Sequence, residues 1–397
     1  NKELKIRWND AGDLFSKVYF NIADNVTKQL KAKGYNINSY IYTKIGKYVQ
    51  LGTEKGMTMT FSSGATKKER DEVGDMSKVK TQITVPKDVF KQFLVPAARG
   101  GRFEKDEVTK DDGKPYTIFT PYSRKWKARL QEKDIAAFDT EKYFANFYQQ
   151  ATKAIPYLES MGFKSVDKPF PTKELNEAII SKYTEQRNFP AVRGTTQLGV
   201  HFRFGTISIR AAARKAMVLN ETYLNELIWR DFYHTIIYHF PHVQQGKSFK
   251  KEYDFIEWRN NENEFQKWCD RQTGYPIVDA GMRELNATGF MHNRVRMIVA
   301  SFLTKHLLLD WRLGEAYFAK KLLDFDFAAN NGGWQWASGS GCDAAPYFRI
   351  FNPYLQTKKF DEKLTYIKKW VPEFQEFTYP KPIIEHEVAR KRCLEIY

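Results

Sequence analysis

Apolar residues recur at helical spacing close to the start of the chain. Residues 13–33 carry an apolar side chain at every fourth position, and Gly34 follows them. This spacing places the apolar side chains on one face of a helix, and glycine often ends a helix. We therefore predict one amphipathic helix here. Its apolar positions are Leu14, Val18, Ile22, Val26 and Leu30.

Short alternating or β-branched runs follow this helix. They occupy Ile37–Tyr42, Gly56–Phe61 and Gln82–Val85, with a charged stretch at Ser62–Lys80 between the last two. Such runs are typical of strands. The first hundred residues are therefore predicted to form a small α/β or α+β unit, and the sequence AARGG at 97–101 is predicted to be a junction.

Helical periodicity dominates from Asp139 onward. One predicted helix carries polar and aromatic residues three and four positions apart, and a second carries Asn293, Arg296 and Met297 in the same way. We expect these two faces to converge on a pocket. An exposed ion pair within the first helix is the alternative explanation. The first face consists of Tyr223, Glu226, Trp229, Arg230 and Tyr233.

The stretch from 324 to 353, DFDFAANNGGWQWASGSGCDAAPYFRIFNP, crowds acids, amides, glycines and indoles together. The run from Asn330 to Gly333 is predicted to break a helix and to let backbone approach a flat ligand. Trp334 and Trp336 then supply indoles that can stack or be oxidised. A loop with two buried tryptophans is the alternative.

Composition narrows the class of protein. With 397 residues, two domains are expected. A net charge of +16 favours a polyanionic partner, either nucleic acid or an anionic membrane surface. The three cysteines form no CxxC pair, so neither a disulfide framework nor a zinc site is indicated. No signal peptide or membrane-spanning run is found, and a cytoplasmic protein is expected.

Several long motifs resemble one family. They are YTEQRNFPAVRGTTQLGVHFRFGTISIR at 183–210, YLNELIWRDFY at 223–233, TGYPIVDAGMRELNATGFMHNRVRM at 273–297, and the stretch at 324–353. In this order they resemble the flavin-binding domain of the DNA photolyase and cryptochrome family, from about residue 102 to 397. The resemblance implies an all-α FAD-binding and DNA-repair domain at 181–397, a connector and helical linker at 101–180, and an atypical α/β or α+β domain at 1–100.

The resemblance also implies a cofactor, FAD, that works in its fully reduced state, and no metal. A hydroxyl-rich turn would bind its phosphates, a charge pair would lie beside its isoalloxazine ring, and a neutral amide would face its reactive nitrogen. Gln197 and Gly199 depart from the more usual arginine and serine. The implied cofactor residues are Tyr183, Thr195, Thr196, Gln197, Leu198, Gly199, Tyr223, Arg230, Arg296, Asp324, Asp326 and Asn330.

Electron-transfer and substrate residues follow from the same resemblance. An electron relay would run through Trp334, Trp311 and Trp258, because indole is among the side chains easiest to oxidise. Glu226 and Asn293 would bind the base edges of a pyrimidine dimer as catalytic residues. The remaining substrate and DNA contacts implied are Arg187, Trp229, Arg294, Met297, Trp336 and Gln356.

Asn293 also bears on the subclass, since the branch that repairs six-four photoproducts places a histidine there. The chain thus resembles bacterial-type cyclobutane pyrimidine dimer photolyases, acting as a monomer on damaged DNA. A cryptochrome-like photoreceptor, or a flavin protein without repair activity, is the alternative. Residues 1–100 do not show the family's opening strand or its Arg-rich turn, so no folate or deazaflavin antenna pigment is expected.

Overall fold

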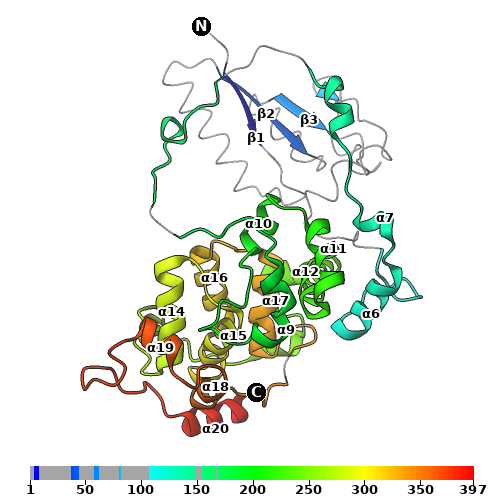
Figure 1. Ribbon diagram of the computed structural model, residues 1–397. Coiled ribbons are helices and arrows are strands. Elements are labelled where there is room, and N and C mark those ends of the chain that lie inside the picture. The colour runs from blue at the N-terminus through cyan, green and yellow to red at the C-terminus, as the bar shows by residue number, and fades with distance from the viewer. Residues whose placement is uncertain are drawn as a thin grey trace. The chain divides into compact units, whose positions relative to one another are not determined.

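The computed structural model describes residues 107–148, 154–166, 169–344 and 346–397, together with four strands that precede them (Figure 1). The chain divides into two compact units, Asn1–Val95 and Pro96–Tyr397. We describe each unit by itself.

The first unit contains a parallel sheet of four strands in the order β1-β2-β3-β4. Leu4 pairs with Ile37 across β1 and β2, and Tyr40 pairs with Thr58 across β2 and β3. Adjacent parallel strands need long crossover connections, which the sequence between them provides. The strands are β1 (Leu4–Trp8), β2 (Ile37–Thr43), β3 (Thr58–Phe61) and β4 (Lys80–Thr81).

Two of the predicted strands, at 37–42 and 56–61, are confirmed within a few residues at each end. The predicted helix at 13–33 and the strand at 82–85 lie outside the described residues. A further strand, β1, occupies Leu4–Trp8, where the sequence patterns predicted none. In β1 the apolar residues Leu4, Ile6 and Trp8 alternate with two charged residues. This short alternation was not recognised as a strand pattern. The choice between an α/β and an α+β unit stays a prediction.

The second unit is built from helices. The connector contributes α6 and α7, and the helices from α8 onward carry every predicted site residue that lies on a helix. The helices are α6 (Phe119–Arg129), α7 (Glu132–Ile135), α8 (Glu177–Ser181), α9 (Tyr183–Gln186), α10 (Gly199–Phe204), α11 (Ile209–Leu219), α12 (Glu221–His239), α13 (Glu262–Cys269), α14 (Pro276–Thr288), α15 (Asn293–Ser301), α16 (Trp311–Lys321), α17 (Phe327–Ser338), α18 (Pro353–Phe360), α19 (Thr365–Trp370) and α20 (His386–Ile396).

Shorter helical turns join these elements. The 3-10 turns are η2 (Glu141–Asn146), η3 (Leu158–Met161), η4 (Pro241–Gln245) and η5 (Lys251–Phe255), and a π-helical turn, η6 (Phe302–His306), continues α15.

Polar side chains fix where the site-bearing helices begin. Asn220 accepts the backbone N–H of Tyr223 at the start of α12, and His292 accepts that of Arg294 at the start of α15. Asp326 caps α17 in the same way. A capping side chain satisfies a backbone donor that the helix leaves free. These caps set the register of the residues that follow them.

The run Asn330–Gly333 does not break a helix, contrary to the prediction. It lies inside α17, which continues to Ser338 and ends at Gly339, whose φ is +90°. Gly332 is required by packing rather than by a turn, because a Cβ there would overlap the Tyr233 ring. Close packing between α12 and α17 therefore outweighs the low helix propensity of two consecutive glycines.

The core of the helical unit falls into two clusters. One gathers around Trp268, Trp311 and Trp334, and the other around Trp126 and Phe232. Helix α17 packs against α12, α15 and α16, as Figure 1 also shows. The site residues on these helices are thereby brought to one region.

Within the described part of the chain, no helix is both long and apolar enough to cross a bilayer. Cys269, Cys342 and Cys393 are buried and form no disulfide.

Candidate active site

Helix α12 presents Glu226, Trp229 and Arg230, as its spacing predicted. The alternative of an ion pair between Glu226 and Arg230 is wrong. Arg230 instead donates to Asp326 at 3.3 Å, and Glu226 pairs with Arg187. Both residues of α12 therefore find partners on other segments, and the face is part of a built site.

Arg187 links α9 to α12. It donates to Glu226, and its guanidinium lies 5.4 Å from the centre of the Tyr183 ring. Burial raises the pKa of Glu226, and the charge of Arg187 opposes this rise. Glu226 keeps 32% of its side chain exposed. Arg187 is already paired with this carboxyl group, and the pairing competes with its predicted role in binding DNA.

Arg296 and Asp324 form the predicted charge pair. Arg296 Nη2 donates to the two carboxylate oxygens of Asp324 at 2.9 and 3.1 Å, and its Nε donates to the Met291 carbonyl at 2.7 Å. A Cβ at Gly199 would lie 3.1 Å from Asp324 Oδ2. The hydroxyl-rich turn therefore meets the charge pair at Gly199.

Asp326 holds a second cluster together. It accepts from Arg230, lies 3.5 Å from His234 Nε2, and caps α17 through Ala328 and Ala329. Burial alone would raise the pKa of Asp326, but the bonds to His234 and the charge of Arg230 lower it below its ordinary value. The group is therefore a fixed carboxylate that joins α12 to α17.

Asn330 has a partner that the sequence did not reveal. Its amide nitrogen donates to the backbone carbonyl of Glu315 at 3.1 Å and to its Oε1 at 3.0 Å. Burial raises the pKa of Glu315, and the bond from Asn330 opposes this. Glu315 lies fifteen residues earlier, on α16, so no local pattern linked the two.

The hydroxyl-rich turn precedes α10. Thr196 Oγ1 lies 3.0 Å from Tyr223 Oη, and Gln197 has a left-handed φ of +55°. Leu198 is buried beneath the turn. Thr195, Thr196 and Gln197 line a surface hollow together with Asn176 and Arg193. The turn thus presents hydroxyls to a hollow beside Arg193, whose charge suits phosphate, and beside Glu174, whose charge opposes it.

Curated relatives share most of the helical unit. The chain is 38% identical over 319 residues to deoxyribodipyrimidine photo-lyase of Escherichia coli, covering 71% of this chain and 67% of that protein. It is 39% identical over 337 residues to the Synechococcus enzyme, covering 74% and 69%. The chain belongs to the DNA photolyase family.

A further relative is matched over a smaller share of its length. The photo-lyase of Neurospora crassa is 45% identical over 262 residues, which is 56% of this chain and 43% of that protein. Residues 223–378 match the family described as FAD binding domain of DNA photolyase. The predicted family and the predicted FAD cofactor are confirmed by these matches.

Solved photolyase structures have a similar fold. A class III photolyase from Agrobacterium tumefaciens superposes with a TM-score of 0.66 at 28% identity, over 100% of this chain and 90% of that one. A Sulfolobus tokodaii photolyase with two FAD molecules gives 0.61 at 28%, over 95% and 86%. A Synechocystis cryptochrome gives 0.58 at 21% over 94% and 86%, which is a similarity of fold.

The residues present fit a bound flavin dinucleotide. Gly333 is exposed, and a Cβ there would meet no atom within 4 Å, so α17 leaves open space beside Asn330. Arg296 and Asp324 keep 24% and 19% of their side chains exposed although they are paired. A partly exposed charge pair next to a hydroxyl turn suits a ligand with both a polar ring and phosphates.

The three relay tryptophans share one region. Trp311 and Trp334 are buried in one core cluster, and Trp258 is partly buried against it. Trp334 contacts Gly314, one turn after Trp311 on α16, because a Cβ there would overlap the Trp334 ring. The Nε1 atoms of Trp258 and Trp311 are buried without a hydrogen-bond partner. Indoles set in apolar surroundings suit the predicted relay, and that role stays a prediction.

Trp268 was missed by the sequence patterns. It is fully buried, and its ring centre lies 6.2 Å from that of Trp334 in an edge-on arrangement. The chain has nine tryptophans, and no sequence pattern distinguished Trp268 from the others.

The predicted substrate residues differ in their exposure and in their contacts. Asn293 is exposed as the first residue of α15, and Met297 follows one turn later, partly buried. Arg294 donates to Asn188 at 2.6 Å and lies 4.3 Å from the centre of the Phe360 ring. Gln356 Oε1 is buried without a partner. Trp336 is partly buried, with its ring 6.5 Å from that of Phe351.

His292 shows how closely the arginines gather. Burial lowers its pKa to about 4, helped by the charges of Arg296, Arg294 and Arg187. Since Arg187, at the end of α9, binds Glu226, the end of α9, the start of α15 and the Glu226 turn of α12 lie close together. The predicted convergence of the two faces is consistent with this grouping.

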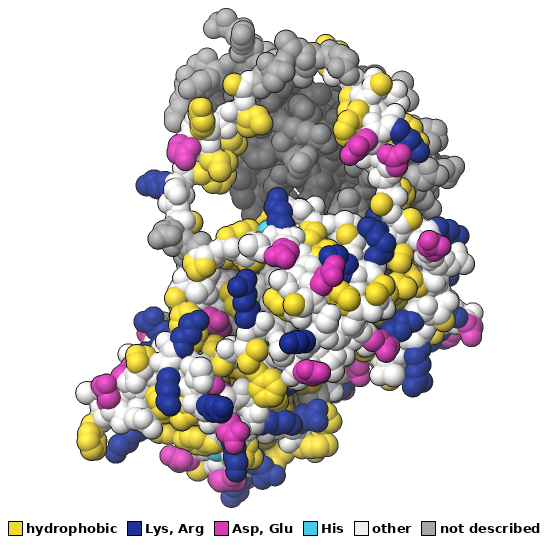
Figure 2. All heavy atoms as spheres, viewed as in Figure 1, with side chains coloured by type: hydrophobic (Ala, Val, Ile, Leu, Met, Phe, Trp, Pro, Cys, Tyr) yellow, Lys and Arg dark blue, Asp and Glu magenta, His cyan; other side chains and the backbone are white. Residues whose placement is uncertain are grey.

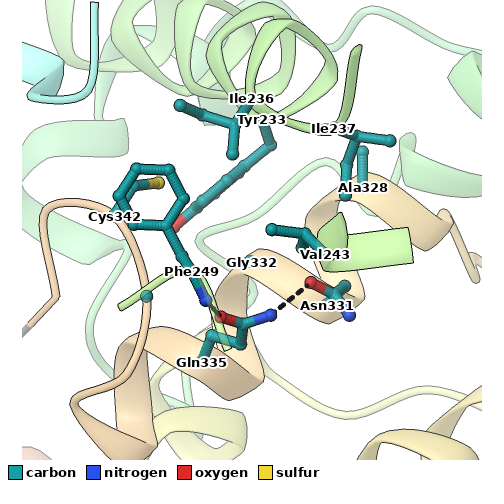
Figure 3. Close-up of a pocket in the computed structure, with 11 residues that line it drawn as sticks. Tyr233, Ile236, Ile237, Val243, Phe249, Ala328, Asn331, Gly332, Gln335 and Cys342 are labelled. Atoms are coloured by element: carbon teal, nitrogen blue, oxygen red, sulfur yellow. Dashed lines mark hydrogen bonds between the residues drawn. The ribbon is translucent and has the colours of Figure 1, made fainter. Parts of the chain in front are cut away.

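A small apolar pocket lies behind the site, between α12 and α17 (Figure 3). Gln335 accepts from the backbone of Phe249 at 2.8 Å and donates to Asn331 at 3.0 Å. These bonds fix the buried side of α17, so that its other side can face a ligand. On the face in Figure 2, basic side chains are scattered over the helical unit with acidic ones among them.

Proposed function

We propose that this chain is a deoxyribodipyrimidine photo-lyase, which repairs cyclobutane pyrimidine dimers in DNA with light. The observation that supports it most is that α12 carries Glu226 and also binds Asp326 through Arg230, while α15 carries Asn293 and binds the neighbouring Asp324 through Arg296, in a chain of this family. A binding site for pyrimidines thus adjoins a binding site for flavin.

The cofactor is held by this chain's own groups. Thr195, Thr196 and the backbone through Gly199 bind the phosphates, while Arg296, Asp324 and Asn330 bind the ring. Bound there in its fully reduced state, FAD would supply the light-driven electron that splits the dimer, and the electron would return to it, so that no net redox change results. No folate or deazaflavin antenna is required in this proposal.

Glu226 and Asn293 orient the dimer. Burial favours the protonated form of Glu226, which can donate a hydrogen bond to a pyrimidine carbonyl. Arg187 keeps that carboxyl group in place and adds positive charge next to it. Negative charge that develops on the carbonyl is thereby stabilised.

Aromatic side chains exclude water from the flipped dimer. Trp229 and Trp336 provide flat walls, and Met297 adapts to the remaining gap. Photolyases extrude their target nucleotides from the duplex, and the two joined pyrimidines of a dimer lie next to each other on one strand. Arg294 and Gln356 then hold the DNA strand beside the pocket.

We further propose that the protein acts as a monomer in the cytoplasm. The free thiols of its buried cysteines suit a reducing compartment. We also keep the division into residues 1–100, 101–180 and 181–397 as a proposal.

The test is light-dependent repair of an oligonucleotide that contains one thymine dimer. The reduced holoprotein should restore the intact thymines under blue light, leave them dimerised in the dark, and leave an undamaged strand unchanged. Binding of damaged and undamaged duplex with equal affinity at fixed salt, without repair, would instead favour a photoreceptor.

A further inference from the structure

Phe119 lies flat against the indole of Trp229. The two ring centres are 3.7 Å apart and the planes differ by 4°. Among the ring contacts between described residues, this is the closest and most parallel stack. An aromatic ring has two faces, so one face of Trp229 is already covered by a residue of the connector.

Phe119 is held in place by its own helix. Helix α6 packs against α12. Trp126 Nε1 donates to Asp231 at 3.0 Å, and Ser123 donates to Asn225 at 3.3 Å. These buried bonds leave α6 little freedom to slide, so the Phe119 ring is a rigid support.

Asp343 ties the start of α6 to the segment after α17. Its Oδ2 accepts the backbone N–H of Phe119 at 3.0 Å, and Ile118, the residue before the helix, makes no side-chain cap. Asp343 belongs to the same segment as Trp336, only seven residues later. A carboxylate is favourable at a helix N-terminus. One contact therefore links the supports of both aromatic walls.

We propose that Phe119 is a positioning residue that fixes the plane of Trp229 and so sets how well the site distinguishes a pyrimidine dimer from undamaged DNA. The proposal rests on the proposed function. Phe119 covers one face of the indole and the Tyr233 ring lies 5.4 Å away with a tilt of 30°, so a base can stack only on the part of Trp229 that these rings leave open. Loss of the support lets the indole tilt, which weakens stacking of the dimer but leaves phosphate contacts unchanged.

The experiment compares Phe119→Leu, Phe119→Tyr and the wild-type holoprotein. Affinity is measured for a dimer-containing duplex and its undamaged counterpart at fixed salt, together with FAD content and repair per absorbed photon at saturating DNA. Phe119→Leu should weaken dimer binding roughly three- to tenfold, the range expected for a lost aromatic stack. Neither the affinity for undamaged DNA nor the FAD content should change. Phe119→Tyr keeps an aromatic ring and should therefore retain the wild-type affinity for the dimer.

Two further variants keep the test decisive if Phe119→Leu does not fold. Asp343 is exposed, so Asp343→Ala should fold and should lower dimer binding in the same direction, by less. Phe265→Leu is the matched control, because Phe265 is a partly buried phenylalanine stacked on Trp268 at 5.8 Å and 18°. It should leave both DNA affinities unchanged.

Unchanged dimer binding in Phe119→Leu and Asp343→Ala would overturn the inference. Tighter dimer binding in Phe119→Leu would also overturn it, since Phe119 would then occupy the face that the base needs. Equal losses for damaged and undamaged DNA would point to general destabilisation. A wild-type protein that repairs no dimers would overturn the proposed function, whereas repair by the wild type with no effect of these variants would overturn the inference alone.

Discussion

Each charged residue of the site takes a partner from a different element. Arg187 binds Glu226 on α12, Arg230 binds Asp326 before α17, and Arg296 binds Asp324. A paired charge loses less of its solvation energy when a ligand covers it than an isolated charge does. The pairs therefore keep the site ordered while leaving it able to accept a polar ligand.

Glu226 should give repair a pH dependence. Its pKa is raised by burial, so the protonated form persists to higher pH than in a free glutamate and is lost as the pH rises through that value. Repair by the wild type should therefore fall with rising pH. Glu226→Gln, which donates at every pH, should remove this fall, and Glu226→Ala should lose about tenfold or more throughout. Repair per absorbed photon from pH 5 to 9, at saturating DNA, is the measurement.

The ionised carboxylate would be the working form if Glu226→Gln were as inactive as Glu226→Ala. Asn293→Ala provides the comparison, because it removes a neutral contact and should lower repair without changing the pH profile.

Trp311→Phe should separate two activities. Phenylalanine is much harder to oxidise than indole and fits the buried site beside Trp334. Photoreduction of the oxidised flavin by external reductant should fall at least tenfold, while repair by chemically reduced protein stays near the wild-type level. Transient absorption after a laser flash measures the first, and dimer repair the second. Photoreduction at the wild-type rate would show that Trp311 is ordinary core.

Sequence patterns predicted the site residues but only some of their contacts. The positions of Arg296, Asp324 and Glu226 followed from family motifs, and the first two form the predicted pair. The partners Glu315 and Phe119 were missed, since each contact joins segments that only the folded chain brings together. Periodicity reports the face of a helix, not which residue of another element meets it.

At the scale of elements, the site depends on how α17 packs. Asp326 fixes its start, Gly332 lets Tyr233 approach, and Gln335 anchors its buried side. One rigid helix therefore positions both Asn330, which donates to Glu315 on α16, and Trp334, which lies in the core. A rigid element holds such groups more accurately than a loop does.

Gly332→Ala and Gly333→Ala should have opposite effects. A methyl group at Gly332 would overlap the Tyr233 ring, so overpacking should lower the free energy of unfolding by roughly 1–3 kcal/mol. At Gly333 the methyl group meets no atom, and the gain in helix propensity should raise apoprotein stability by up to about 1 kcal/mol. Urea unfolding of the apoproteins measures both. Equal destabilisation would mean that α17 tolerates neither substitution for a shared reason, such as backbone strain.

Helices α12 and α15 were predicted well, and α17 was not. The first two follow simple periodicity with a capping residue before them. In α17 the paired glycines carry a strong local signal for a break, which tertiary packing overrides. Helical character was predicted for the linker at 101–180, but the bounds of α6 within it were not, because that motif was interpreted only through its place between domains.

Across the whole molecule, one buried lysine should limit stability. Lys305 is 1% exposed on the π-helical turn, and burial lowers its pKa from 10.5 to about 8. Its ammonium lies 3.4 Å from the centre of the Tyr397 ring and 3.4 Å from the Tyr347 carbonyl. Because the folded-state pKa is the lower one, the unfolded chain binds the proton more tightly. The penalty is fully present below about pH 8 and disappears as the pH rises toward 10.5.

Lys305→Met should therefore raise the free energy of unfolding at pH 7 by roughly 1–3 kcal/mol, after the loss of the cation–π contact is deducted. The advantage over the wild type should vanish near pH 10. Urea unfolding of both proteins at pH 7 and pH 10 is the measurement. A variant that is less stable at pH 7 would show that the contact with Tyr397 outweighs the cost of burial.

The bonds between α6 and α12 also bear on modularity. The match to the FAD-binding family begins at Tyr223, on α12, yet the buried indole of Trp126 and the hydroxyl of Ser123 reach that helix from a hundred residues earlier. A fragment that starts at the family boundary would expose the apolar face of α12 and deprive Asp231 of its indole partner. The recognisable sequence module is therefore not an autonomous folding unit: residues 223–378 alone should be recovered as aggregate, whereas a fragment that begins ahead of α6 should remain soluble and take up FAD.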